Sequence, residues 1–146
     1  MTHSEPMPCQ SLLRTGMARS ILSEVAERLN RLAYRGQATS IDLRSLPMTD
    51  ADREELESLL GRGEINASLA LLGRTEIWET AYAGVWWVRH LDGNERVSSE
   101  ELAVTFAPDI LMSHPADVQV AAHRLRQDVE TAATGTVEQP EEAGDG

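Results

Sequence analysis

Cysteine, phenylalanine and tyrosine are scarce in this chain of 146 residues, which has one, one and two of them respectively. The single cysteine, Cys9, excludes a disulfide within the chain and any zinc or iron–sulfur site that takes several cysteines from one chain. No apolar run approaches the roughly 20 residues that cross a bilayer, and the N-terminus lacks the basic and apolar stretches of a signal peptide. We expect a cytoplasmic protein that does not insert into membranes.

Basic residues are also few, since 13 lysines and arginines stand against 24 acidic residues and the formal net charge is -11. A surface that binds phosphates needs clustered lysine and arginine to displace counterions. The charge balance therefore excludes nucleic acid and anionic membranes as expected partners. It favours encounter with a basic partner, because opposite charges raise association rates.

The length and the 41% apolar content suffice for one hydrophobic core, so a single compact domain is expected. The first residues, MTHSEPMPCQ, hold two prolines and no hydrophobic periodicity, and the last, TGTVEQPEEAGDG, are rich in glutamate, glycine and proline. We predict a disordered leader over residues 1–14, one domain over residues 15–133 and a disordered acidic tail over residues 134–146.

Three segments have the apolar spacing of amphipathic helices. The first covers residues 17–34 and stops at Gly36, a favourable C-terminal residue. The second follows Thr49, a favourable N-cap, carries acidic residues in its first turn, and ends at Gly61. The third begins at Pro115, because proline is preferred at the first helical position.

Five segments have strand-like patterns, and they cover residues 41–45, 64–73, 76–82, 85–91 and 102–106. In the second of them, Leu72 and the alanines leave a helical turn possible. Turn signals separate the last three segments, which predicts an antiparallel meander. We therefore expect an α+β fold of two layers, with the three amphipathic helices packed on one face of a mainly antiparallel sheet of about five strands. The other face would be at least partly open.

Residues suited to catalysis or metal binding are isolated along the chain. None of the four histidines lies three or four residues from another, as in a metal pair on a helix. Spacing places no acid or nucleophile beside His90, so a structural role or a partner contact is expected, whereas His114 precedes Pro115 as a helix cap. Asp42 and Arg44 are read as solvated or as an ion pair. Without a phosphate-binding glycine loop, a nucleophile elbow or a dinucleotide fingerprint, we expect neither an enzyme nor a cofactor.

All three tryptophans lie in one stretch, TEIWETAYAGVWWVRHLDG, which covers residues 75–93. Neighbouring residues of a strand point to opposite faces, so Trp86 and Trp87 cannot both enter one core. Either one fills the core and the other lies under a loop or a chain terminus, or one belongs to an exposed patch that binds a partner. The candidate partner-binding residues are Trp78, Tyr82, Trp86, Trp87, Arg89 and His90.

Several segments, taken in order, resemble one known family. They are IDLRSLP (41–47), GEINA (63–67), EI and ET (76–80), GVWWV (84–88) and PDIL (108–111). Together they resemble the C-terminal domain of the HupH/HyaF-type hydrogenase expression and formation proteins over roughly residues 18–130.

This resemblance implies an accessory, chaperone-like protein in the maturation of nickel-iron hydrogenases, with no catalytic residues of its own. The implied partner is an immature hydrogenase subunit, above all the iron–sulfur small subunit, or another hydrogenase maturation protein. A twin-arginine leader is a basic partner that would suit the acidic surface. Family members are typically longer at the N-terminus, and a homodimer or a separate companion could replace that region. The alternative is a metal- or cluster-handling protein in which Cys9, His90 or His114 supplies ligands across a dimer.

Overall fold

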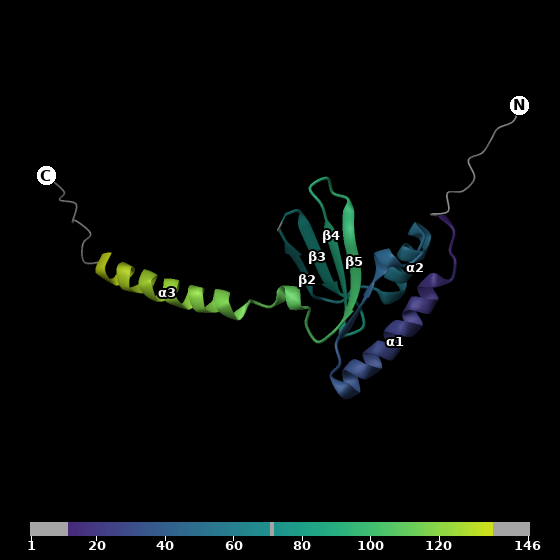
Figure 1. The fold of residues 1–146 in the computed structure, drawn as a ribbon, viewed down its shortest axis with the longest axis horizontal. Coiled ribbons are helices and arrows are strands. Elements are labelled where there is room, and N and C mark those ends of the chain that lie inside the picture. The colour runs from purple at the N-terminus through teal and green to yellow at the C-terminus, as the bar shows by residue number, and fades with distance from the viewer. Residues whose placement is uncertain (1–11, 71, 136–146) are drawn as a thin grey trace, which may run out of the picture. The chain divides into compact units, whose positions relative to one another are not determined.

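The computed structural model describes residues 12–70 and 72–135, which form two compact units that meet in sequence between Pro108 and Asp109. The first unit contains helices α1 and α2 and a five-stranded sheet (Figure 1). The second contains the short 3-10 helix η3 and the long helix α3. The predicted α+β class is therefore confirmed. The predicted leader and tail lie almost wholly outside the described residues.

The sheet has the strand order β1-β5-β4-β3-β2, and every neighbouring pair is antiparallel. Strands β3 to β5 form the predicted meander, β2 extends it beside β3, and β1 joins the free side of β5. The strands are β1 (Thr39–Asp42), β2 (Asn66–Leu69), β3 (Arg74–Glu79), β4 (Val85–Leu91) and β5 (Val97–Val104).

The bounds of every strand except β4 differ from the sequence prediction, and two of the differences have a clear local cause. The first strand ends at Asp42, where a 3-10 turn, η2 (Leu43–Ser45), begins, because the Asp42 carboxylate accepts a hydrogen bond from the Arg44 N–H at 3.0 Å. The last strand begins at Val97, five residues before the predicted start, in the polar run VSSEE. Pairing with β4 places this run in the sheet although its own pattern does not favour a strand.

The helices begin and end close to the predicted residues. Helix α1 (Met17–Arg35) ends at Gly36 in the left-handed conformation, and α2 (Asp50–Leu60) begins with a capping box between Thr49 and Asp52.

The second unit holds η3 (Asp109–Leu111) and α3 (Pro115–Gly135). The His114 ring accepts a hydrogen bond at Nδ1 from the Ala116 N–H at 3.1 Å, which confirms the predicted helix cap. Where the apolar stripe of α3 packs stays a prediction.

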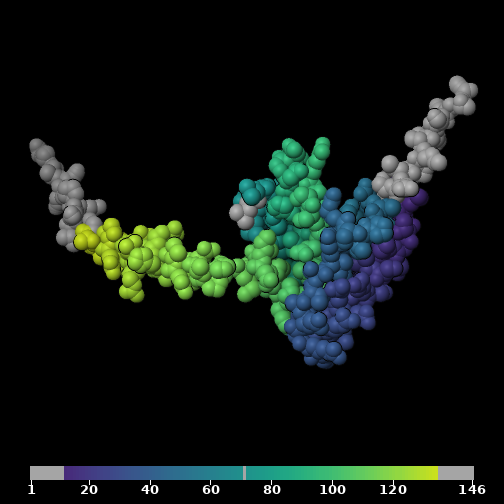
Figure 2. Space-filling model, in the orientation of Figure 1, coloured from purple at the N-terminus to yellow at the C-terminus, as the bar shows by residue number. Residues whose placement is uncertain are grey.

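The core of the first unit lies between one face of the sheet and the two helices. In Figure 2, α1 and α2 lie against each other beside the strands. Strand residues that point to the helices include Trp78, Trp87 and Leu102, all at most 2% exposed. The helices contribute the buried residues Ala18, Ile21, Val25, Leu32, Leu56 and Leu60. We call this side of the sheet the helix face and the other side the second face.

Candidate protein-binding site

Trp78 and Trp87 stack on each other within the core. They lie directly opposite each other on β3 and β4, with ring centroids 5.6 Å apart and ring planes 7° from parallel. Offset stacking of this kind adds about 0.5–1.5 kcal/mol to the burial of the rings. Both residues therefore hold the helix face together and present no free surface to a partner.

Trp86 points to the second face, as the alternation of β4 requires. Its side chain is only 4% exposed, and its Nε1–H donates to the Thr105 carbonyl at 3.2 Å. The expectation that Trp86 or Trp87 belongs to an exposed patch is therefore wrong. Both are buried, one on each face of the sheet.

A buried ion cluster lies beside the tryptophan stack, around Glu100 on β5. The Glu100 carboxylate is 0% exposed and accepts hydrogen bonds from Arg53 Nε at 2.6 Å, from Arg89 Nε at 2.7 Å and from Trp87 Nε1 at 2.9 Å. Arg53 lies on α2, whereas Arg89 lies on β4, so one carboxylate ties the helix to the sheet. Burial alone would lower the pKa of Arg89, but hydrogen bonding and attraction to Glu100, together with Glu57, raise it above its ordinary value.

The cluster continues to the surface through Glu57 and Arg62. Glu57 pairs with Arg89 at 3.2 Å and with Arg62 at 3.5 Å. The guanidinium of Arg62 lies over the Trp78 ring, 4.0 Å from its centroid, and that of Arg89 lies 5.0 Å from the same centroid. Arg89, a predicted partner-binding residue, thus has its charge satisfied within the protein.

Sequence reasoning missed Glu100, Arg53 and Glu57. Glu100 falls in the polar run that did not resemble a strand, and the two others are ordinary polar residues of an amphipathic helix. The one signal was that Glu100 lies two residues before Leu102, which places both side chains on the same face once the strand is extended.

His90 lies half-buried on the second face. Its Nδ1 is 2.5 Å from the hydroxyl oxygen of Thr75, the residue opposite it on β3. This contact fixes the ring, and a partner contact by His90 stays a prediction.

Of the metal-ligand residues suggested by the sequence, Cys9 lies outside the described residues. In the part of the chain that the structure describes, no group of three or more histidine, cysteine or acidic side chains is arranged to hold a metal ion.

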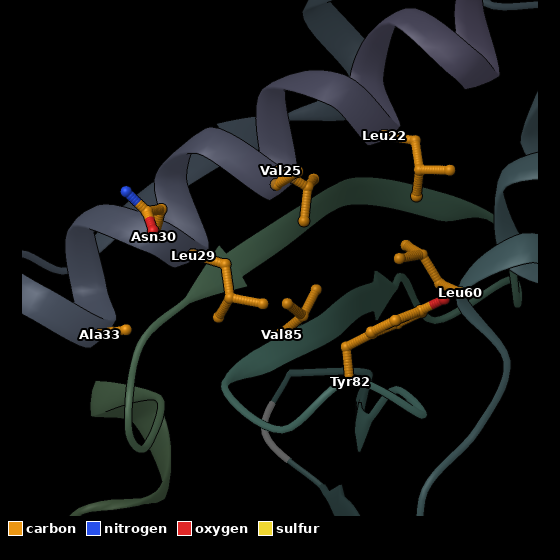
Figure 3. A pocket seen from close by; sticks show the side chains of 9 residues that line it. Leu22, Val25, Leu29, Asn30, Ala33, Leu60, Tyr82 and Val85 are labelled. Carbon is orange, nitrogen blue, oxygen red and sulfur yellow. The ribbon is translucent and has the colours of Figure 1, made fainter.

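An apolar groove opens between α1, the end of α2 and the turn that joins β3 to β4 (Figure 3). Its volume is about 460 Å³. Among the described residues that line it, only Asn30 and Tyr82 have polar side chains. The Tyr82 ring, which is 51% exposed, extends toward Leu60. The other lining residues are Leu22, Val25, Ala26, Leu29, Ala33, Leu60 and Val85.

Main-chain hydrogen bonds hold the walls of this groove. The Ala81 N–H donates to the Leu60 carbonyl at 2.9 Å, which joins the β3–β4 turn to the last residue of α2. Gly84 has a φ of 91°, and a Cβ there would lie 3.2 Å from Leu29 and 3.3 Å from Leu32, so the glycine lets α1 approach the turn. A smaller hollow of about 270 Å³ shares Leu29 and Ala33 with the groove.

The rim of the groove and of the smaller hollow carries exposed aromatic residues. Tyr82 is 51% exposed and Phe106, which lines the smaller hollow, is 71% exposed. Of the six predicted partner-binding residues, only Tyr82 is thus more than half exposed. The candidate binding surface lies at the end of the sheet, where the sequence placed only that residue.

Asp52 anchors the segment before α1 to the start of α2. Its carboxylate accepts hydrogen bonds from the Thr15 N–H at 2.7 Å, the Thr15 hydroxyl at 2.6 Å and the Thr49 N–H at 3.1 Å. Burial alone would raise the pKa of Asp52, but these hydrogen bonds outweigh it and lower the pKa below its ordinary value. The carboxylate is therefore a fixed structural charge near the N-terminal end of both helices.

Comparison with known proteins decides the family. Residues 16–132 match the family described as HupH hydrogenase expression protein, C-terminal conserved region. The chain belongs to this family. A solved structure of the hydrogenase expression protein HupH from Thiobacillus denitrificans ATCC 25259 has 37% sequence identity and a TM-score of 0.77, over 81% of this chain and 98% of that one. The resemblance noted in the sequence and the α+β fold are therefore both confirmed.

Curated relatives are longer than this chain. The hydrogenase expression/formation protein HoxQ of Azotobacter vinelandii is 30% identical over 109 residues, which are 73% of this chain and 38% of that protein. The hydrogenase-1 operon protein HyaF of Escherichia coli strain K12 is 31% identical over 91 residues, 62% of this chain and 32% of that protein. The chain thus spans less than two fifths of the length of these relatives. None of the helices in the described part of the chain has the length and apolar character needed to cross a membrane.

Proposed function

We propose that the protein is a non-catalytic, cytoplasmic accessory factor in the maturation of nickel-iron hydrogenase. Its partner is an immature hydrogenase subunit, most simply the iron–sulfur small subunit, or another maturation protein. Membership of the hydrogenase expression family supports the process, and the names of the similar proteins HoxQ and HupH support it as well. The apolar groove supports the mode of action, which is to hold apolar side chains of a partner.

The chemistry of the groove favours binding over catalysis. Asn30 and Tyr82 offer the polar side-chain groups among the lining residues that the structure describes, whereas general acid–base catalysis needs a positioned titratable group within hydrogen-bonding reach of the reacting atom. A half-exposed tyrosine on an apolar rim is typical of protein-binding hot spots. An apolar segment of an incompletely folded subunit has the exposed side chains that such a groove can cover.

The experiment places a charge in the groove without disturbing the core. Ala33 lines the groove and its side chain is exposed, so Ala33→Glu leaves the buried residues unchanged. Ser20 is exposed on the same helix and does not line the groove, so Ser20→Glu adds the same charge elsewhere. Binding of both variants and of the native chain to the small subunit is measured by calorimetry, with the subunit before and after cofactor insertion.

We expect Ala33→Glu to weaken binding about tenfold or more, because a charge would be buried against apolar side chains without a partner. Ser20→Glu should bind like the native chain. Equal binding by all three proteins would show that the groove is not the site. If the native chain binds neither a hydrogenase subunit nor another maturation protein, the proposed function itself is wrong.

A further inference from the structure

The two edges of the sheet differ in how well their main chain is covered. At the β1 edge, the Arg28 guanidinium donates to the Ser40 carbonyl at 3.3 Å, and the chain turns away after Asp42 into η2. At the other edge, β2 has the sequence Asn66-Ala67-Ser68-Leu69, with no charge and no proline. Natural sheets protect their edges with charges, proline or covering segments. The described residues of the first unit provide none of these devices at the β2 edge.

The register shows which main-chain groups of β2 face outward. The Glu79 N–H donates to the Ile65 carbonyl at 3.0 Å and the Glu79 carbonyl accepts from the Gly63 N–H at 2.7 Å, so the main chain of Glu79 faces β2. By the alternation of β3, the hydrogen-bonded pairs of the β2–β3 ladder are then Ala67 with Ile77 and Leu69 with Thr75. In an antiparallel ladder such pairs alternate with pairs whose groups point away. The N–H and C=O groups of Asn66 and Ser68 therefore point to the free edge.

The side chains around this edge are sorted by face. Asn66 lies opposite Trp78 in the register, so Asn66 and Ser68 belong to the helix face, and both are exposed. Ala67 and Leu69 belong to the second face and are half-buried, and Ile65, on the same face just before the strand, is 48% exposed. An added strand must match a polar row on one face and an apolar row on the other.

We propose that β2 is a dimerisation edge, at which a second copy of this chain adds its own β2 in antiparallel orientation about a two-fold axis at Ala67. In this register Asn66 of each copy lies opposite Ser68 of the other. The outward N–H and C=O groups of these residues then form two hydrogen-bonded pairs. On the second face Ile65 contacts Leu69 of the second copy, and the two Ala67 residues meet at the axis. Polar groups pair on the helix face and apolar groups on the second face.

A second copy fits this edge better than an unrelated strand for two reasons. The segment is self-complementary, because a two-fold axis at Ala67 exchanges Ile65 with Leu69 and Asn66 with Ser68, which is the condition for an isologous interface. It is also uncharged over residues 65–70, in a protein whose net charge of -11 makes two copies repel elsewhere.

Disulfide trapping tests the register directly. Opposed residues of a non-hydrogen-bonded pair have Cα atoms about 4.5 Å apart, which lies within the range that a disulfide spans. In a Cys9→Ser background, Ala67→Cys should form a disulfide-linked dimer in glutathione buffer about ten times faster or more than Ser40→Cys, an exposed position on the protected β1 edge. Equal rates would overturn the proposal.

A second variant separates pairing from random collision. The Ser68 N–H makes no bond within its own sheet, so Ser68→Pro removes only an outward donor, which edge strands tolerate. The native chain should sediment as a dimer at about 50 μM, and the Ser68→Pro variant as a monomer with an unchanged circular dichroism spectrum. When Ser68→Pro and Ala67→Cys are combined in one chain, the fast cross-link should be abolished. Ser68→Lys serves the same purpose if the proline variant does not fold.

Two results of the sedimentation experiment would overturn the proposal. A native chain that is monomeric up to about 200 μM has no dimerisation edge of useful affinity. A dimer that survives both Ser68→Pro and Ser68→Lys uses another surface. If the native chain is monomeric and Ser68→Pro weakens binding to a hydrogenase subunit, the edge accepts a strand of that protein and the second copy is excluded. None of these results depends on the groove.

Discussion

Replacing Glu100 by glutamine removes the charge at the centre of the buried cluster and keeps the size of the side chain. In the native protein one carboxylate oxygen accepts from Arg53 Nε at 2.6 Å, and the other accepts from Arg89 Nε at 2.7 Å and Trp87 Nε1 at 2.9 Å. A glutamine has one acceptor oxygen, so its NH₂ group must face at least one of these N–H donors. The variant therefore places donors against each other in a buried site.

The size of the stability loss depends on which ion pairs the two arginines keep in the variant. Breaking a buried ion pair by removing one partner costs about 3–5 kcal/mol. Here Arg53 keeps Asp50 at 3.2 Å and Arg89 keeps Glu57 at 3.2 Å, and the two arginine side chains are 23% and 19% exposed. We therefore expect the free energy of unfolding to fall by about 2–3 kcal/mol, somewhat below that range.

Urea unfolding followed by tryptophan fluorescence measures this loss, because two of the three tryptophans lie beside the cluster. With a slope of about 1–3 kcal/mol per molar urea, the midpoint should fall by roughly 1–2 M. Glu101→Gln is the matched control, since Glu101 is the next residue on β5, lies on the second face and has no ion pair among the described residues. Its effect should stay within about 0.5 kcal/mol. If the two variants are equally stable, Glu100 does not tie α2 to the sheet.

Two further perturbations test other parts of the fold. Asp52→Asn should lower the free energy of unfolding by about 1–2 kcal/mol at pH 7. Because the folded pKa of Asp52 lies below the ordinary value of 3.8, the stability that its charge contributes is present above that pH and is lost as the pH falls further. The difference in stability between the variant and the native chain, measured by urea titration, should therefore close below pH 3.8. A gap that is independent of pH would contradict this. Gly73→Ala should cost about 2 kcal/mol or more in thermal unfolding, because Gly73 has a φ of 125° and an added Cβ would collide with the Leu91 carbonyl. Gly93→Ala, where a Cβ meets no atom within 4 Å, is the control and should melt within a few degrees of the native chain.

Local signals in the sequence were sufficient for most of the secondary structure. The predicted helix after Thr49 ends at Gly61 as observed, because a capping residue at one end and a glycine at the other mark a helix without help from the rest of the chain. Strand β4 has the predicted bounds, since turn residues flank a run of β-branched and aromatic side chains. The strand alternation also placed Trp86 and Trp87 on opposite faces correctly.

Burial could not be predicted in the same way, because it depends on segments far apart in the chain. Alternation says which face Trp86 occupies, but not that the carbonyl of Thr105, 19 residues later, accepts its N–H. The groove likewise requires α1 to meet the β3–β4 turn, with Leu29 and Tyr82 more than fifty residues apart in sequence. Sequence patterns give faces and boundaries, whereas sites depend on which faces meet.

Trp87, one of the two tryptophans that suggested a binding patch, is connected to the candidate site through the core. Trp87 donates to Glu100, which holds Arg53 of α2, and the last residue of that helix, Leu60, forms a wall of the groove. Leu60 in turn accepts the N–H of Ala81, next to Tyr82. A continuous chain of contacts thus runs from the buried indole to the half-exposed tyrosine. Because binding costs less when the site is already ordered, substitutions in the core should weaken a partner's affinity by loosening the groove, even though all three tryptophans are buried.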